Sequence, residues 1–151
     1  MNVTIVRDHD PEATRQILAV LPDWFGIPEA NEHYVRAAAE KASYLARVDN
    51  TTVGVALLDR HFPMTGEIHL IAVTPQAHGS GVGSALLAAI EADLVADGAH
   101  LLEVKTVGAS FADEGYAATR AFYQARGFLP LEEFEGLDWD GPTLIMVKPL
   151  T

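Results

Sequence analysis

The chain has 151 residues, a length that suits one domain, and its 49% hydrophobic and 21% charged residues are typical of a folded protein. The formal net charge is −11 with only 10 Lys and Arg residues, which argues against a basic surface for nucleic acid. Cysteine is absent, which excludes disulfides, cysteine metal sites and a thiol nucleophile. We therefore expect a single domain over residues 1–151 whose partner is not a nucleic acid.

The sequence also argues against membrane insertion. The stretch "MNVTIVRDHD" lacks the apolar core of a signal peptide. Apolar runs such as "VGVALL" and "ALLAAI" are far shorter than the ~20 residues that cross a bilayer. These features predict a cytoplasmic protein with no membrane partner.

The first half of the chain predicts a strand, two helices and then three strands. Asp10 provides an N-cap, and Pro11 and Glu12 suit the first turn of a helix. The segment "PDWFGIPEA" (22–30) predicts a loop, because two prolines and a glycine interrupt it. In chain order the expected elements are 2–6 (strand), 10–21 and 31–42 (helices), then 43–49, 52–62 and 67–73 (strands).

From Gly81 the apolar pattern changes to the period of a helix, which Gly98 ends. The remaining expected elements are 81–97 (helix), 100–107 (strand), 116–126 (helix), then 128–134 and 143–149 (strands). This order predicts an α/β (α+β) domain with a mixed, mostly antiparallel sheet of about six to seven strands and about four flanking helices. One parallel pair is expected where the 81–97 helix crosses over.

The segment "PQAHGSGVGSALL" (75–87) places three glycines at alternate positions before a helix. A helix N-terminus presents unpaired N–H groups and partial positive charge, and glycines let an anion approach them, so we predict a phosphate site. The ATP/GTP P-loop does not fit because the stretch has no lysine, and the dinucleotide fingerprint requires different spacing. A tight turn alone would need fewer glycines.

Two segments resemble motifs of the GNAT superfamily of N-acetyltransferases. "EIHLIAVTPQAHGSGVGSALL" is similar to its acetyl-CoA-binding segment, whose Gln/Arg-x-x-Gly-x-Gly/Ala signature falls on His78, Gly81 and Gly83. His78 departs from the usual Gln or Arg. "YAATRAFYQARGF" resembles the late motif of the family at Phe122-Tyr123 and Gly127-Phe128. The two motifs lie in the family's order with a strand between them, and the expected strand order resembles the family fold from residue 2 to 149.

The resemblance implies acetyl-CoA as acyl donor and direct transfer to an amine in a ternary complex, without a covalent enzyme intermediate. Tyr123 aligns with the tyrosine that protonates the departing thiolate, and a phenol is protonated at neutral pH. The alternative is that Tyr123 is a core aromatic whose hydroxyl lies at the rim. Its neighbour Phe122 is expected in the core. The implied cofactor-binding residues are the backbone of Ile71, Ala72 and Val73, the phosphate segment His78, Gly79, Ser80, Gly81, Val82, Gly83 and Ser84, and Thr119.

Acetylation of an amine also requires a proton acceptor, because an alkyl ammonium keeps its proton to a pKa of about 10. Strand alternation predicts that Glu67, His69, Ile71 and Val73 share one face. Glu67 aligns with the base of the histone-acetylating branch of the family, and His69 titrates near neutrality. Three alternatives remain: a water chain as base, Glu67 as a solvated residue at the strand start, and His69 as a satisfied buried histidine.

Aromatic and acidic residues gather in the two segments where the family usually binds its acceptor. They are Trp24, Phe25, Tyr34, Phe111 and Tyr116, with Asp23, Glu29, Glu32, Asp113 and Glu114. We expect a small-molecule primary amine as acceptor. The alternatives are a protein lysine or N-terminus as acceptor and a non-catalytic acyl-CoA-binding module, and a homodimer stays open. The histidines form no His-x-x-x-His pair, so no metal site is predicted.

Overall fold

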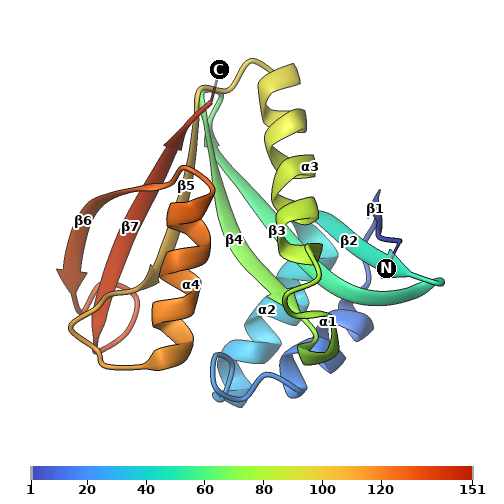
Figure 1. Cartoon of the computed structure of the whole chain (residues 1–151), viewed down its shortest axis with the longest axis horizontal. Coiled ribbons are helices and arrows are strands. Elements are labelled where there is room, and N and C mark those ends of the chain that lie inside the picture. The colour runs from blue at the N-terminus through green and yellow to red at the C-terminus, as the bar shows by residue number, and fades with distance from the viewer. Residues whose placement is uncertain (1, 151) are drawn as a thin grey trace.

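A computed structural model of the chain describes residues 2–150 (Figure 1). The helices are α1 (Pro11–Ala19), α2 (Pro28–Glu40), the 3-10 turn η1 (Pro75–Ala77), α3 (Val82–Ala96) and α4 (Glu114–Ala125). The strands are β1 (Thr4–Arg7), β2 (Ala42–Val48), β3 (Thr51–Phe62), β4 (Thr65–Val73), β5 (Leu101–Val107), β6 (Leu129–Glu135) and β7 (Pro142–Pro149).

Within these residues the seven strands form one sheet in the order β1-β2-β3-β4-β5-β7-β6. Every neighbouring pair is antiparallel except β4 and β5, which α3 connects. The expected mixed, mostly antiparallel sheet with four α-helices is therefore confirmed. The second helix was placed too late, because Pro28 occupies its first turn, where a proline is compatible with a helix.

Two apolar clusters cover the two faces of the sheet. Leu86, Ile90 and Leu94 of α3 pack with Ile68 and Leu102 on one face. The other face carries a cluster from α1, α2 and the sheet, whose members include Ile17, Leu18, Ala38, Leu45, Leu57 and Leu70. The sheet is thus the middle of three layers, and β4 contributes residues to both clusters.

Strands β4 and β5 separate along their length. They pair only from Thr65 to Ile68 on β4 and from Leu101 to Val104 on β5, although both strands continue further. Beyond Val104, β5 remains paired with β7 instead. Figure 1 shows the two ribbons close together at one end and apart at the other. The gap leaves one edge of the last residues of β4 without a strand beside it.

A β-bulge at His69 changes which residues of β4 share a face. Leu57 of β3 lies opposite Leu70, whereas the next residue, Leu58, lies opposite Ile68, so His69 is the extra residue. Ile71 and Val73 consequently pack against the cluster of α3, while the His69 ring contacts Tyr34 of α2. The expectation that His69 shares a face with Ile71 and Val73 is wrong, because simple alternation does not hold across a bulge.

Candidate active site

The glycines before α3 serve two different purposes. Gly79 and Gly81 have φ angles of 75° and 86°, a left-handed conformation that side chains other than those of glycine rarely adopt. Gly83 lies inside α3, where a Cβ atom would come within 3.2 Å of the Phe122 ring. Two glycines therefore shape the turn, and the third allows α4 to approach α3.

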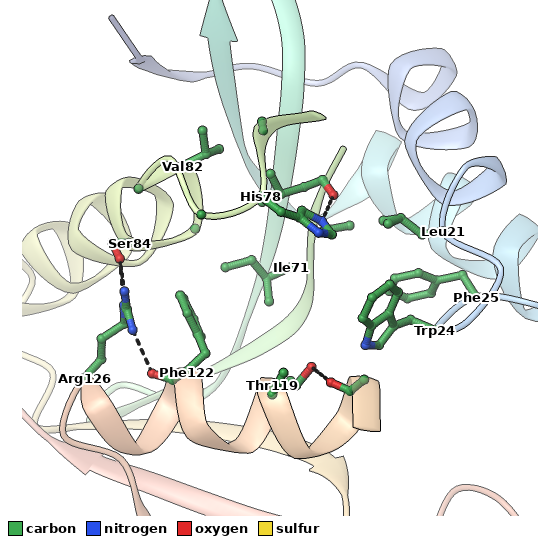
Figure 2. A pocket seen from close by; sticks show the side chains of 18 residues that line it. Leu21, Trp24, Phe25, Ile71, His78, Val82, Ser84, Thr119, Phe122 and Arg126 are labelled. Atoms are coloured by element: carbon green, nitrogen blue, oxygen red, sulfur yellow. Dashed lines mark hydrogen bonds between the residues drawn. The ribbon is translucent and has the colours of Figure 1, made fainter. Parts of the chain in front are cut away.

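A first cavity of about 540 Å³ opens at this turn, between the end of β4, α3 and α4 (Figure 2). Most of the expected cofactor residues line it: Ile71, Ala72, Val73, His78, Gly79, Gly81, Val82, Gly83, Ser84 and Thr119. Ser80 does not, because its hydroxyl turns back to donate to the Ala77 carbonyl. The structure thus brings together residues that the sequence separates by almost fifty positions.

The free edge of β4 faces this cavity. The Thr74 amide donates to the Val53 carbonyl at 2.9 Å. Hydrogen-bonded and non-hydrogen-bonded pairs alternate along an antiparallel ladder, so the next pair, Val73 and Gly54, is a non-hydrogen-bonded one. The backbone groups of Val73, and by the same register those of Ile71, therefore point away from β3 into the gap. Those of Ala72 are directed at β3, so Ile71 and Val73 are the residues that can pair with an extended ligand.

The His78 side chain covers part of this edge. Its Nε2 atom lies 2.7 Å from the Val73 carbonyl oxygen, and its ring meets Trp24 edge-on at 6.0 Å between centroids. Figure 2 shows the ring at the end of the strand, joined to this oxygen by a dashed line. A ligand that donates to this carbonyl therefore competes there with His78.

One face of α4 supplies two residues that the sequence analysis missed. Phe122 packs, partly buried, against the cluster of α3 and also lines the first cavity, because Thr119, Phe122 and Arg126 share a helix face at i, i+3 and i+7. Arg126 Nε lies 2.7 Å from Ser84 Oγ, and its guanidinium stacks 3.9 Å from the Phe122 ring centroid. The spacing of these three residues could be read from the sequence. The guanidinium of Arg126 brings a permanent positive charge to the start of α3.

A second cavity of about 560 Å³ adjoins the first and shares Trp24, Phe25 and Ile71 with it. Its lining includes seven of the expected acceptor residues: Asp23, Trp24, Phe25, Tyr34, Phe111, Asp113 and Tyr116. Glu29, Glu32 and Glu114 lie outside the lining, and Glu32 pairs with Arg15 at 3.1 Å. Asp138 and Trp139, which the sequence analysis missed, also line it, so the loop between β6 and β7 closes this cavity.

Tyr123 lines the second cavity and is only 3% exposed. Its ring packs edge-on against Phe122 and Phe128, with centroid distances of 5.3 Å and 5.2 Å. Burial raises the pKa of its phenol, since the charged form would be poorly solvated there. The phenol is therefore protonated at neutral pH and available as a donor.

His69 also lines the second cavity. Its Nδ1 atom lies 3.4 Å from Asp59 Oδ2, and its Nε2 atom is buried without a hydrogen-bond partner among residues 2–150. Burial lowers the pKa of the imidazole, and the Asp59 carboxylate opposes this effect. His69 thus lines the cavity while its Nε2 atom is shielded from solvent, and its role as proton acceptor stays a prediction.

Glu67 lies apart from both cavities. It is 7% exposed, with Oε1 2.5 Å from His61 Nε2 and Oε2 3.5 Å from Lys105 Nζ. The alternative of a solvated residue at the strand start is therefore wrong. The structure separates the two candidate bases and places only His69 in a cavity wall.

Asp59, His61 and Glu67 bring three metal-ligand types within 4.8 Å of one another across the β3–β4 hairpin. The sequence analysis compared only histidine spacings and missed this group. Lys41 Nζ lies 2.5 Å from Asp59 and Lys105 Nζ 3.5 Å from Glu67, so both carboxylates have cationic partners. The absence of a metal stays a prediction.

A mixed sheet that opens between two parallel strands, with a glycine-rich helix start at the opening, defines the fold of acyl-CoA-dependent transferases. Residues 8–128 match the profile of the "Acetyltransferase (GNAT) family", and the chain belongs to this family. Acetylation with acetyl-CoA is general for the family. A search of curated proteins finds no match in sequence.

Solved structures share the fold over almost the whole chain. An acetyltransferase-family protein from Desulfovibrio desulfuricans is 24% identical, covering 99% of this chain and 100% of its own, with a TM-score of 0.87. The ribosomal-protein-S18-alanine N-acetyltransferase from Escherichia coli is 19% identical, and the match covers 99% of this chain and 95% of its own, with a TM-score of 0.75. A GNAT acetyltransferase from Elizabethkingia anophelis, solved with acetyl-CoA bound, is 20% identical, covering 99% of each chain, also at 0.75.

None of the helices described over residues 2–150 combines the length and apolar character that a membrane crossing requires.

Proposed function

We propose that the protein transfers an acetyl group from acetyl-CoA to the primary amine of a small molecule, by direct attack in a ternary complex. The observation that carries this proposal is the contact between the two cavities. Both include Trp24, Phe25 and Ile71 in their linings, so a thioester and an amine bound in separate cavities can meet there. His69, two residues before Ile71 on β4, and Tyr123 of α4 both line the second cavity.

The first cavity suits the donor in size and chemistry. Its volume of about 540 Å³ lies within the usual range of ligand pockets. The groups of Ile71 and Val73 that point away from β3 can pair with the amides of a pantetheine arm as an added strand would, and the arm competes with His78 at the Val73 carbonyl. The start of α3 offers unpaired N–H groups to the pyrophosphate, and Arg126 adds a positive charge at Ser84.

His69 is the proton acceptor in this proposal. The N–H bond of the acceptor ammonium breaks, its proton moves to the imidazole of His69, and the electron pair stays on the amine nitrogen. The amine then attacks the thioester carbon and the C–S bond breaks. Glu67 is assigned no proton transfer, because it is buried against His61 and Lys105 outside the cavities.

Tyr123 is the proton donor. Its hydroxyl proton passes to the departing thiolate, and the second amine proton, released as the amide forms, restores the phenol. The high pKa that burial gives this phenol keeps it protonated before the reaction. No group of the protein forms a covalent bond to the acetyl group in this sequence.

The second cavity favours a small cation as acceptor. Asp23, Asp113 and Asp138 in its lining outnumber the single cation, Lys105. Trp24 and Tyr34 offer aromatic faces, which attract ammonium groups as well. A volume of about 560 Å³ accommodates a small molecule without requiring an open groove.

The experiment is a panel of small primary amines, peptides and intact proteins, each incubated with acetyl-CoA. Release of the free thiol is followed, and products are identified by mass spectrometry. We expect thiol release and a single added acetyl group with small cationic amines. Modification of peptides or proteins alone would contradict the small acceptor. Tight acetyl-CoA binding without any acceptor turnover would indicate a non-catalytic module instead.

A further inference from the structure

We propose that Trp24 sets the size of the acyl group that the protein transfers, and restricts it to the two carbons of an acetyl group. This inference rests on the proposed function, because it requires a thioester in the first cavity and an amine in the second. Trp24 is a half-buried residue of the loop between α1 and α2. Its place at the opening between the two cavities carries the proposal.

The transferred acyl group must lie where the two cavities meet. In direct transfer the carbonyl carbon contacts the thiol sulfur on one side and the amine nitrogen on the other. Among residues 2–150 the two cavity linings share Trp24, Phe25 and Ile71. A carbonyl carbon in contact with both reactants therefore lies among these three side chains.

The carbons beyond the carbonyl have little freedom of direction. The pantetheine arm occupies the way back into the first cavity, and the amine occupies the second, so these carbons must point at the wall of the opening. Ile71 forms one side of this wall, and it is held by pairing with β3 and by packing against the cluster of α3. Trp24 and Phe25 form the other side, so their rings decide how much room the acyl group has.

Of these two aromatic residues, Trp24 is the one whose ring neighbours line the first cavity. The Phe25 ring packs edge-on against Tyr34 of the second cavity, with 5.8 Å between centroids. The Trp24 ring meets His78 edge-on at 6.0 Å and lies against Gly115 of α4, and both of these residues line the first cavity. Figure 2 draws the indole between His78 and α4. The indole therefore closes the first cavity at the opening.

Several contacts fix the position of Trp24. A Cβ atom at Gly115 would lie 3.1 Å from Cζ2 of the indole, so this glycine lets the ring lie directly on the helix. The Tyr116 hydroxyl donates to the Trp24 carbonyl at 3.2 Å, and the Trp24 amide donates to the Leu21 carbonyl at 3.2 Å. The side chain also packs against the apolar cluster of α1 and α2. A wall held in this way can discriminate acyl groups by size.

The first test compares acetyl-, propionyl- and butyryl-CoA as donors to one amine, by kcat/KM for each donor at saturating amine. A hydrophobic pocket discriminates one methylene group by about 10–200-fold, so the unsubstituted protein should prefer acetyl-CoA over propionyl-CoA by about tenfold or more. Trp24→Ala should remove this preference and make butyryl-CoA a substrate. Trp24→Phe keeps a smaller aromatic ring and should give an intermediate preference.

Trp139→Ala is the matched control. Trp139 is the other tryptophan of the chain, and it lines the second cavity but not the first. Its loss affects the binding of the amine, but this effect cancels when two donors are compared with the same amine. The preference for acetyl-CoA should therefore stay unchanged. Thermal melts establish that each variant is folded, and Trp24→Phe provides the comparison if Trp24→Ala does not fold.

The second test needs no amine. Nuclear Overhauser effects are recorded from the isotope-labelled methyl group of bound acetyl-CoA, in a Trp139→Phe protein whose only tryptophan is Trp24. We expect an effect between this methyl group and the indole protons. Its absence, while the pantetheine arm shows effects to the protein, would overturn the proposal.

The outcomes separate the inference from the proposed function. An unsubstituted protein that uses propionyl- and butyryl-CoA as well as acetyl-CoA overturns the role of Trp24. An acetyl preference that survives in both Trp24 variants, or that Trp139→Ala removes equally, also overturns it and leaves the proposed function intact. A protein that acetylates no amine, but whose bound acetyl methyl group contacts the Trp24 indole, supports the placement of the acyl group and refutes only the proposed function.

Discussion

Arg126, the C-cap residue of α4, donates to the hydroxyl of Ser84 in the first turn of α3, with Nε 2.7 Å from Oγ. The contact places a guanidinium where the helix already presents unpaired N–H groups. Both residues line the first cavity, and the Phe122 ring holds the guanidinium from its other side. The donor site therefore has a charged component in addition to the glycine-rich backbone.

Substitution of Arg126 tests this component. We expect Arg126→Met to raise the Kd for acetyl-CoA about tenfold, in line with about 1.5–3 kcal/mol for a hydrogen bond to a charged group. Calorimetry measures the change. Arg120→Met is the matched control, because Arg120 lies on the same helix, outside the first cavity, and bonds the Val107 carbonyl at 2.7 Å. Equal affinities for the Arg126 variant and the unsubstituted protein would remove Arg126 from the donor site.

A substitution at Gly81 tests the phosphate site. Gly81 and Gly98 have nearly equal φ angles, 86° and 84°, and both face open space. Aspartate at either position costs about 1 kcal/mol or more in backbone strain, so both variants should lose similar stability in thermal melts. Only Gly81→Asp should abolish acetyl-CoA binding, because its carboxylate repels the phosphates. Retained binding by a folded Gly81→Asp protein refutes the assignment.

Tyr123→Phe tests the proton donor. The ring packing against Phe122 and Phe128 remains, so we expect unchanged acetyl-CoA affinity and a kcat lower by roughly 10²–10⁴-fold. Tyr44→Phe provides the control. It removes a buried hydroxyl that donates to Asp93 at 2.7 Å, far from either cavity lining, and should lower stability without changing kcat. An unchanged kcat in Tyr123→Phe would reduce Tyr123 to a packing role.

The pH dependence distinguishes His69 from the acceptor amine. The pKa of His69 is lowered, so the base is available above this value and is lost as the pH falls through it. We expect kcat/KM to fall over that range with two acceptors whose amine pKa values differ by several units. His69→Asn should remove the limb, whereas Glu67→Gln should retain it with a small shift to lower pH.

A limb that follows the acceptor's own pKa and ignores both substitutions would point to solvent as the proton acceptor. A limb that Glu67→Gln removes, with His69→Asn unaffected, would return the role to Glu67. The outcomes differ in which substitution changes the pH profile. One set of profiles therefore decides among His69, Glu67 and solvent as the proton acceptor.

The sequence predicted the parts of the site that depend on local pattern. The glycines of residues 79–83 mark the start of α3, and the late motif identifies Tyr123. The face of α4 that carries Phe122 and Arg126 was also readable, since helical spacing alone defines it. The cavity contact of Phe122 was missed because that residue was considered by itself instead of with the whole face.

The surroundings of His69 could not be read in this way. The bulge depends on how β3 pairs with β4, and alternation within β4 carries no information about that register. Asp59 reaches His69 only through this pairing, and Lys41 reaches Asp59 from the end of α2. Contacts between strands thus determine the proposed base, whereas local motifs determine the donor site.

Initial-rate kinetics with both substrates varied test the central claim most directly, because the two cavities meet and the chain has no cysteine nucleophile. Thiol release should require the amine, and double-reciprocal plots against one substrate at several levels of the other should intersect. This pattern is that of direct transfer in a ternary complex. Parallel lines, with thiol release before the amine is added, would mean a covalent acetyl-enzyme and would contradict the account.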